Sequence, residues 1–524
     1  MQNGLVEVAK IGDCPPGTVM AVTVNNVDIA LCNYEGSFYA LNNRCPHRGG
    51  QLSDGRLQGS DLICPLHNWD FDVRTGISRY NSLDKVPTYP VAIQEGKVFL
   101  NEQDVPVEPK EHDDYLAKWR RPFDDRETAM NYIHFLSKGK GARLEAMRTE
   151  EVVPGFDSLL FLPGQVAALP LLDDELVETK LLLGPKAKKP LELRIPVYVS
   201  HMSYGSLSPE SKTAMALGAK RFGTAICSGE GGMHPMEREA AGDYIFEMAS
   251  GYFGFSDENV KKATAIDFKF GQSAKAGLGG ILPAEKVTSE IAAVRGVPQG
   301  IEVHSPSRFP DLNTLDELKA RIELLRTKVE GPIGAKLAAS HVERDLEAVA
   351  YCGFDFVTLD GRGGGTGAAP VHVKDNICVP LVYALPRARR WLDEHRHLDI
   401  TLVATGGLRT PSDFAKALAL GADCVAISTA AMMAIGCQQY RACHNNTCPV
   451  GIATQKSELR DRFDIEMSAR RLVNFLEAAE KQLKDFCRMT GHHKLSNLNK
   501  TDLVTMDMAL AQYGGIPHAA EYRG

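Results

Sequence analysis

The sequence lacks several features that would place it in a class at once. It has no apolar run approaching the roughly 20 residues of a membrane-spanning helix, and no charged and then apolar leader opens it. A formal net charge of -7 argues against general nucleic-acid binding, which needs clustered positive charge. Twelve cysteines in 524 residues are too few for a disulfide scaffold. We therefore expect a cytoplasmic protein without membrane or nucleic-acid partners, whose cysteines are reduced thiols or metal ligands.

The first part of the chain has the pattern of a small all-β domain. Turn residues separate short apolar segments, which are TVMAVTV, VDIALCN, SFYALNN, DLICPLHNWDFD and KVFLNE. The acidic, proline-bearing stretch EQDVPVEPKEHDD that follows is typical of a linker, and the charged sequence after it favours helix. We expect the β domain over residues 1–104 and the linker with its helical segment over 105–154.

From about residue 190 the pattern changes to that of an α/β fold. Helix-length spacers separate eight apolar segments, which are PVYVSHMS, TAICSGE, DFKFG, GIEVHSP, IGAKLAA, FVTLDGRGGG, LVATGG and CVAIST. This alternation predicts a (β/α)8 TIM barrel, over residues 155–456, rather than an open sheet. Lys, Glu, Gln, Ser and Arg gather just after these segments, where such a barrel has its active site. Residues 457–524 are expected to be a helical tail that ends without structure.

Four candidate metal ligands lie in the β domain, where Cys45 pairs with His47 and Cys64 with His67. Two thiolates and two imidazoles could hold one tetrahedral zinc ion. They could equally hold a Rieske 2Fe–2S cluster, in which two Cys bind one iron and two His the other. The two short Cys-to-His turns, the glycines after His47 and the NWDFD after His67 favour the cluster. Residues 5–103 thus resemble a bacterial Rieske ferredoxin-type domain.

No 2-His-1-carboxylate iron domain is evident downstream, unlike in a Rieske oxygenase, so the barrel is expected to hold the partner redox centre. No strand–turn–helix G-x-G-x-x-G unit for NAD(P) is evident either. Electrons should therefore pass through the clusters.

A second candidate centre is the segment CQQYRACHNNTC, which contains Cys437, Cys443 and Cys448. Free cysteines are often buried in a core, but three of them within this one short segment argue against that interpretation. A zinc ion would need a fourth ligand, and His444 could serve. Thiolates also suit iron–sulfur clusters, and three of them suit a 3Fe–4S cluster or a cubane with one open iron.

Five motifs of the barrel occur in the order of a known family, and they are MSYGSLS, SGEGG, GGGTGAAP, ATGG and CHNNTCPVGIATQ. Together they resemble the FMN-binding synthase domain of glutamate synthase, particularly its short archaeal-type and N-methylglutamate synthase-like versions. The resemblance implies bound FMN and a 3Fe–4S cluster on the three-cysteine segment. The expected FMN contacts are Met202, Ser203, Gln272, Lys336, Gly364, Gly365, Gly406, Gly407, Ser428 and Thr429.

The residue types support some of these contacts independently. Gly406 with Gly407, and Ser428 with Thr429, end the last two expected strands, where a barrel commonly binds phosphate through backbone amides. Lys336 lies in the apolar segment expected as the fifth strand. It would place a cation near the isoalloxazine and stabilise anionic reduced flavin.

The resemblance also assigns substrate roles. Lys269, Gln272 and Lys275 of KFGQSAKAGLGGILP fall at family positions lining the flavin and 2-oxoglutarate, and Arg295 falls at that of the carboxylate-binding arginine. Lys275 and Arg295 would hold carboxylates, because charge-assisted pairs orient them firmly. Glu230 is a candidate proton carrier or amine ligand, and its alternative is a loop-structuring role. Lys275, Glu230 and Lys269 are the expected catalytic residues.

The sequence departs from the family pattern at three places. Leu278 stands where the family usually has a polar or charged residue, Ile281 where it has Gln or His, and Phe309-Pro310 where it has a His pair. Apolar residues there would leave matching substrate groups unpaired, at roughly 1–3 kcal/mol each. A full glutamate synthase begins with a cysteine nucleophile that releases ammonia, whereas this chain begins MQN. We therefore expect a changed substrate and no glutaminase of its own.

Three hypotheses follow for the function. The first is a flavin iron–sulfur oxidoreductase that aminates a 2-oxoglutarate-like 2-oxo acid with ammonia or an amine. The second is the reverse reaction, an amino-acid or amine dehydrogenase, because high Rieske potentials favour electron export through that domain. The third is an electron-transfer subunit without turnover. The expected partners are the small-molecule acid and amine, an external electron carrier such as a ferredoxin or reductase, and a second copy of the chain.

Overall fold

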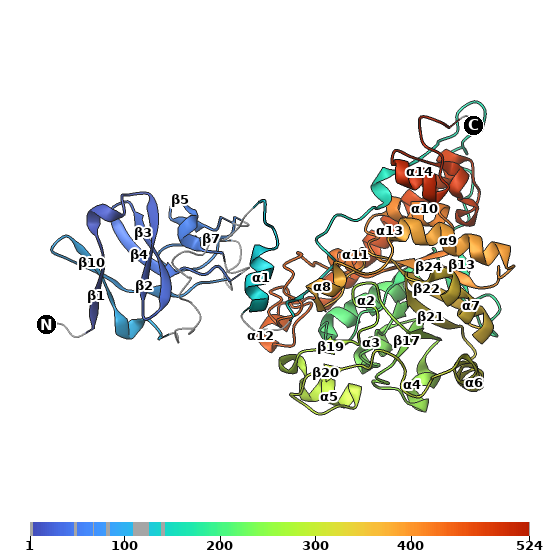
Figure 1. Cartoon of the computed structure of the whole chain (residues 1–524), viewed down its shortest axis with the longest axis horizontal. Helices are drawn as coiled ribbons and strands as arrows, with labels where there is room; N and C mark the ends of the chain where they lie inside the picture. The colour runs from blue at the N-terminus through green and yellow to red at the C-terminus, as the bar shows by residue number, and fades with distance from the viewer. Residues whose placement is uncertain are drawn as a thin grey trace. The chain divides into compact units, whose positions relative to one another are not determined.

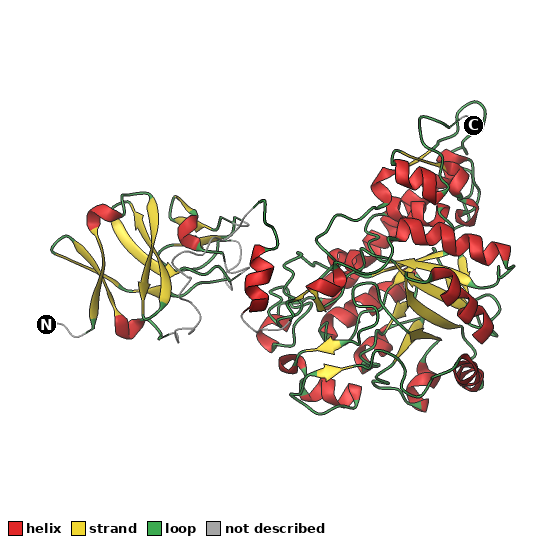
Figure 2. Cartoon of the chain, in the orientation of Figure 1, coloured by secondary structure: helices red, strands yellow, loops and turns green. Residues whose placement is uncertain are grey.

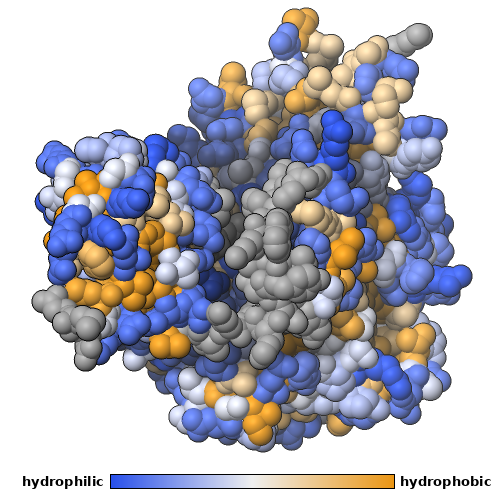
Figure 3. Space-filling model, turned by 60° about the vertical axis from the view of Figure 1, so that its left-hand side comes forward, coloured by the Kyte–Doolittle hydropathy of each residue, from blue (hydrophilic) through white to orange (hydrophobic). Residues whose placement is uncertain are grey.

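The computed structural model of this chain describes residues 4–46, 50–65, 68–79, 84–107, 125–137 and 142–522. It divides into two compact units, Met1–Gly139 and Lys140–Gly524. The face seen in Figure 3 mixes hydrophilic and apolar side chains. None of the helices in the described ranges combines the length and the apolar character needed to cross a bilayer.

The N-terminal unit is built almost entirely of antiparallel strands, as the sequence predicted (Figure 2). The strands are β1 (Leu5–Lys10), β2 (Thr18–Val24), β3 (Val27–Tyr34), β4 (Ser37–Asn42), β5 (Arg56–Gln58), β6 (Asp61–Ile63), β7 (Asp70–Asp72), β8 (Thr88–Tyr89), β9 (Val91–Gln94) and β10 (Lys97–Asn101). They form three small sheets, ordered β1-β10-β9, β2-β3-β4-β8 and β5-β6-β7. One helix, α1 (Met130–Ser137), follows them.

Two-residue turns set the register of the central hairpins in this unit. Asn25 and Asn26 join β2 to β3 with φ values of 54° and 65°, and Glu35 and Gly36 join β3 to β4 with 53° and 85°. Positive φ at both central positions is the type I′ geometry, whose twist matches that of paired strands. β2 therefore pairs directly with β3, and β3 with β4.

The C-terminal unit contains a closed barrel of eight parallel strands (Figure 1). In barrel order these are β15 (Val197–Val199), β16 (Ile226–Cys227), β17 (Tyr244–Ala249), β18 (Ala265–Lys269), β21 (Ile333–Ala338), β22 (Phe356–Asp360), β24 (Thr401–Thr405) and β25 (Cys424–Ile427). The last strand pairs with the first, with Val425 opposite Val197. The prediction of a TIM-type barrel preceded by a small all-β domain is confirmed.

One predicted barrel strand was wrong, and one barrel strand was not predicted. Within GIEVHSP, Val303–His304 forms β20, which pairs antiparallel with β19 (Ile281–Leu282) outside the barrel. The missing strand is β17, whose six residues are all buried. Its acidic residue Glu247 breaks an otherwise apolar segment, and GIEVHSP has the more obvious strand alternation. Local pattern alone therefore selected the wrong segment.

Helices surround the barrel strands in Figures 1 and 2. They are α2 (Pro209–Phe222), α3 (Pro235–Ala240), α4 (Asp257–Lys262), α5 (Ser289–Arg295), α6 (Leu315–Arg326), α7 (Val342–Cys352), α8 (Val371–Lys374), α9 (Leu381–Glu394), α10 (Pro411–Ala419), α11 (Thr429–Ala434), α12 (Ser457–Arg460), α13 (Ile465–Thr490) and α14 (Met508–Gly514). Helix α2 shows how the sequence sets their ends. Ser208 caps its first turn, Pro209 starts it, and Gly223 ends it with a left-handed φ of 91°.

The C-terminal tail does not end without structure, so that expectation was wrong. Helix α13 packs against α2 and α10. Beyond it, β26 (Leu503–Thr505) pairs antiparallel with β12 (Leu159–Phe161), and α14 follows. The partner strand lies more than 300 residues earlier in the chain, and so no local pattern could indicate the pairing.

An apolar hairpin fills the amino-terminal end of the barrel. Strands β13 (Leu181–Leu183) and β14 (Leu191–Leu193) bury leucines against Phe356 and Cys424, the first residues of β22 and β25. This end is therefore closed by packing, and the carboxyl ends of the strands are left to form a site. Two further short strands, β11 (Leu144–Glu145) and β23 (Ala369–Pro370), pair with each other.

Candidate active site and redox centres

A cavity lies at the carboxyl ends of the barrel strands. Its wall begins just after β15, includes Lys336 on β21 and Asp360 at the end of β22, and continues past β24 and β25. The expected FMN contacts among its lining residues are Met202, Ser203, Gln272, Lys336, Gly364, Gly365, Gly406, Ser428 and Thr429. Gly407, the remaining one, does not line it. The structure thus brings nearly the whole predicted set to one cavity.

Two lining glycines sit where a side chain would collide with neighbouring atoms. A Cβ on Gly364 would lie 2.2 Å from Ser273 Oγ and 2.5 Å from Asp360 Oδ1, and one on Gly406 would lie 2.4 Å from the carbonyl oxygen of Gly361. Gly406 also has a left-handed φ of 103°. Glycine is therefore required at both positions by the close packing of the loops that line the cavity. Backbone amides of such loops bind phosphate well.

A second, smaller chamber adjoins the main cavity. Glu230, Gln272 and Lys275 line both spaces, so they stand at the junction. Lys269 and Leu278 line only the chamber. The predicted substrate residues other than Arg295 therefore meet at one place, beside the cavity that fits a flavin.

Charge concentrates at this junction. Glu230 and Lys269 form an ion pair in which both side chains are about nine-tenths buried. Burial works to raise the pKa of Glu230, but Lys269, Lys275 and Arg295 outweigh it and lower that pKa to about 2. Burial lowers the pKa of Lys275 to about 8, although Glu230 opposes the shift. Glu230 is thus a carboxylate at neutral pH.

Arg295 does not line either space. It ends α5 and is 4% exposed; its guanidinium donates to the Tyr204 carbonyl oxygen at 2.6 Å and lies 5.3 Å from the centre of the Phe253 ring. Phe309, one of the departures from the family pattern, is also buried and packs against Phe270 and other aromatic rings. The predicted carboxylate-binding role of Arg295 remains a prediction.

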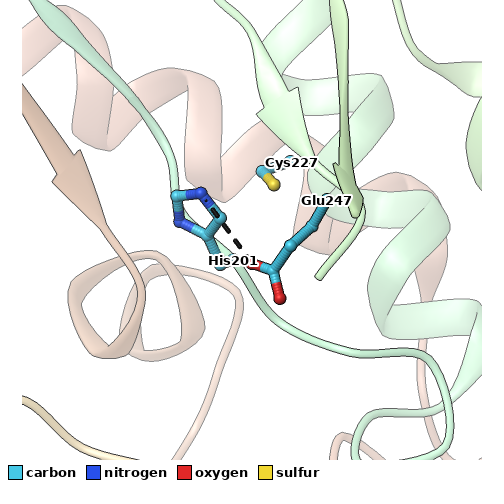
Figure 4. A group of neighbouring side chains, drawn as sticks. All are labelled: His201, Cys227 and Glu247. Carbon is cyan, nitrogen blue, oxygen red and sulfur yellow. Dashed lines mark ion pairs between the residues drawn. The ribbon is translucent and has the colours of Figure 1, made fainter. Parts of the chain in front are cut away.

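A buried network beneath the cavity was missed by sequence reasoning (Figure 4). His201 follows β15 and lines the cavity; its Nε2 lies 2.7 Å from Asp267 Oδ2 and 3.9 Å from Glu247 Oε2. Lys336 Nζ lies 3.9 Å from the same Glu247 oxygen, and Lys269 Nζ lies 3.8 Å from Glu247 Oε1. Acids inside the apolar segments YIFEMA and AIDFK were the signal that could have revealed it.

The same network includes a possible metal-ligand set. Among the described residues, only His201, Cys227 and Glu247 bring such atoms within 4.8 Å of one another. Two ammonium groups already face the Glu247 carboxylate, which disfavours another cation there. Burial lowers the pKa of His201 well below its usual value and raises that of Glu247. The arrangement is better explained as an ion-pair network under the cavity floor.

The three-cysteine segment reaches the main cavity through Cys443. Burial, and next the neighbouring thiols of Cys448 and Cys437, raise the pKa of Cys443 to about 12. In the described chain these three thiols do not converge within 4.8 Å of one another. His444, the alternative fourth ligand, buries Nδ1 without a hydrogen-bond partner among the described residues.

In the N-terminal unit the structure places the two predicted cysteine ligands together. Cys45 and Cys64 are each 1% exposed and belong to one core cluster with Leu62 and Phe71. Backbone bonds from Cys45 N to the Gly50 oxygen and from Cys64 N to the Trp69 oxygen tie their loops. The two predicted histidine ligands, His47 and His67, lie outside the described residues.

Comparisons with known proteins agree with both units. Residues 112–493 match the family model "Conserved region in glutamate synthase", and residues 4–90 match the Rieske [2Fe-2S] domain. The glutamate synthase large subunit-like protein of Rhizobium meliloti is 35% identical over 71% of this chain and 89% of its own length. The archaeal glutamate synthase [NADPH] of Methanocaldococcus jannaschii is 38% identical over 61% of this chain.

The chain spans less than two thirds of that archaeal protein, 63% of its length. Among solved structures, the ferredoxin of carbazole 1,9a-dioxygenase from Nocardioides aromaticivorans is 28% identical over 19% of this chain and 98% of its own, with a TM-score of 0.18. The family match covers most of the chain and includes the whole barrel. The chain therefore belongs to the glutamate synthase family and is an oxidoreductase that carries a Rieske [2Fe-2S] domain at its N-terminal end.

Proposed function

We propose that this chain is an FMN- and iron–sulfur-dependent oxidoreductase that makes or breaks the C–N bond of an amino acid. The observation that carries the proposal is the junction of the two spaces. There a buried cation, Lys275, and a buried carboxylate, Glu230, face both the main cavity and the side chamber. A carboxylate–amine pair is the common feature of amino acids, and these two side chains complement it.

The residues of the main cavity fit FMN. Met202, Leu207 and Met432 on its mixed wall can pack against the isoalloxazine, and the glycine backbone at Gly364 and Gly406 with Ser428 and Thr429 suits the phosphate. Lys336 supplies a cation on the wall. Bound FMN supplies hydride transfer to or from the carbon of the C–N bond.

The chain's own residues bind and orient the substrate. Lys275 holds the carboxylate, and Glu230 holds the ammonium group. Lys269 keeps Glu230 ionised through their ion pair. Gln272, also at the junction, can form a hydrogen bond with the flavin through its side-chain amide. Glu230 lines both spaces. It can therefore bind the amine from the chamber while the carbon of the C–N bond faces the main cavity.

Electrons are proposed to pass through the iron–sulfur centres. The three-cysteine segment would hold a 3Fe–4S cluster with Cys443 at the cavity wall, and the Rieske domain would exchange electrons with an external ferredoxin or reductase. Reductive amination of a 2-oxo acid with ammonia or an amine is the leading direction. The Rieske match favours the reverse reaction as the second candidate, because Rieske potentials are high, at roughly −150 to +300 mV.

An anaerobic half-reaction tests this proposal. Chemically reduced, cluster-loaded enzyme is mixed with 2-oxo acids plus ammonium or alkylamines, and the flavin absorbance is followed; the oxidised enzyme is mixed with amino acids. Reoxidation with formation of an amino acid supports synthesis, and bleaching by an amino acid supports the dehydrogenase. If neither occurs with any acid, the chain is an electron-transfer protein without turnover and the proposal is wrong. Lys275→Met is the matched variant that should weaken either response.

A further inference from the structure

The charged side chains around the junction include one cation that can pair with a substrate carboxylate. Lys269 is paired with Glu230, and Asp360 accepts hydrogen bonds from the Ser273 amide and hydroxyl at 3.0 and 2.9 Å. Lys275 donates only to a neutral group, the Ala368 carbonyl oxygen at 3.2 Å. No carboxylate among the described residues lies within ion-pair distance of it. Lys275 is therefore the cation of the chamber that is left to form an ion pair with a ligand carboxylate.

A second carboxylate finds no comparable partner. Arg295, the other residue with a predicted carboxylate role, is 4% exposed, donates to the Tyr204 carbonyl oxygen and lines neither space. Lys336 lines the main cavity but not the chamber; it faces Glu247 and is the cation proposed to lie beside the flavin. Glu230 itself is an anion that lines both spaces, so it repels a second carboxylate and attracts an ammonium group.

The remaining wall is apolar at two positions. Leu278 lines the chamber and is 46% exposed to it and to solvent, and Ile281 on β19 lines the main cavity. An apolar substrate side chain would cover Leu278 and remove it from water, and this burial stabilises the complex. A charged side chain against the same leucine would lose its hydration without a partner.

We infer that the acid bound at this junction has one carboxylate and an apolar side chain, as in leucine and 4-methyl-2-oxopentanoate, and is not the dicarboxylate glutamate or 2-oxoglutarate. This inference rests on the proposed function and narrows its substrate. The carboxylate binds Lys275, the amine faces Glu230, and the side chain packs on Leu278 and Ile281.

The test compares acids on the FMN-loaded, full-length enzyme. Binding of leucine, norvaline, phenylalanine and glutamate, and of the matching 2-oxo acids, is titrated through the flavin spectrum, and the flavin half-reaction is timed. We expect leucine-like acids to bind at least tenfold more tightly than glutamate. Leu278→Lys adds a cation to the chamber, and a charge-assisted pair of about 1.5–3 kcal/mol should shift the preference towards glutamate by about 10- to 100-fold.

Leu324→Lys is the matched control. Leu324 is 51% exposed on α6 and lines neither space, so this variant should keep the wild-type preference. Tighter binding of glutamate or 2-oxoglutarate by the wild type would overturn the inference and leave the proposed function intact. Failure of every acid to change the flavin spectrum would overturn both.

Discussion

Lys286 Nζ donates to the carbonyl oxygen of Cys443 at 2.8 Å, inside the barrel unit. The same ammonium donates to the carbonyl oxygens of Ser206 at 3.1 Å and Ala453 at 3.0 Å, and the residue is 1% exposed. An ammonium group has three N–H donors, and all three are used here. One side chain therefore ties the three-cysteine segment to the loop after β15 and to the chain beyond the cysteines.

Replacing this lysine should loosen the proposed 3Fe–4S site. Lys286→Met leaves three buried carbonyl groups without their charged donor, at a cost of about 3 kcal/mol or more in folding free energy. We expect lower iron and sulfide content per chain and a weaker 3Fe–4S electron paramagnetic resonance signal. Lys261→Met, on an exposed lysine of α4, is the control and should keep full cluster content. Equal content in both variants would show that Lys286 does not support the segment.

Replacing a cysteine ligand of one iron–sulfur centre should remove that centre and leave the other intact. Cys443→Ser should remove the 3Fe–4S signal and keep the Rieske spectrum, and Cys64→Ser should do the reverse, because each lies in a different compact unit. Cys487→Ser changes a fully buried thiol of α13 that lies outside both centres and should keep both spectra. Zinc in place of iron at the three-cysteine segment, found by metal analysis, would contradict the cluster assignment.

Binding of the substrate carboxylate should weaken at alkaline pH. Burial lowers the pKa of Lys275 to about 8, so the free enzyme loses the cationic form as the pH rises above 8. The dissociation constant of a monocarboxylic acid should then rise by up to tenfold per pH unit. Lys275→Arg keeps its charge at high pH and should give a flat profile. If the affinity of the wild type stays constant from pH 7 to about 10, Lys275 does not bind the substrate carboxylate.

A fully buried ion pair between α2 and α3 should contribute to stability. Lys212 Nζ and Glu237 Oε1 lie 2.7 Å apart, and both side chains are 0% exposed. Lys212→Met leaves a buried carboxylate unpaired, which should cost about 3–5 kcal/mol. Lys212→Met with Glu237→Leu should recover the part of the loss due to the unpaired charge, but not the part due to the buried carbonyl oxygens of Met202 and Ser228 to which Lys212 also donates.

The comparison is with a surface pair of similar geometry. Arg221 and Glu466 lie 2.6 Å apart but are 41% and 58% exposed, so Arg221→Met should cost far less stability than Lys212→Met. Thermal unfolding of all the variants measures the difference. Equal losses from the two pairs would show that burial does not set the contribution of the Lys212 pair.

The sequence indicated the parts of the site that follow strands with clear patterns. Lys336 and Ser428 follow from the apolar segments around them, and glycines marked the loops that a ligand approaches. His201, Glu247 and Asp267 escaped because each is a polar residue inside or beside a buried strand, and their partners lie on other strands. Only the closed barrel brings them together. The buried position of Arg295 and the pairing of β26 with β12 are likewise set by contacts between distant segments.

Isotope-labelled ammonium shows whether this site forms a C–N bond. Chemically reduced enzyme is mixed without oxygen with 4-methyl-2-oxopentanoate or 2-oxoglutarate and ¹⁵N-ammonium, and the products are analysed by mass spectrometry. If the enzyme makes C–N bonds, we expect one ¹⁵N-labelled amino acid per flavin reoxidised. If it works in the reverse direction, we expect one 2-oxo acid per flavin bleached by an amino acid. A flavin that cycles with its electron carrier but forms neither product would contradict C–N bond chemistry in this site.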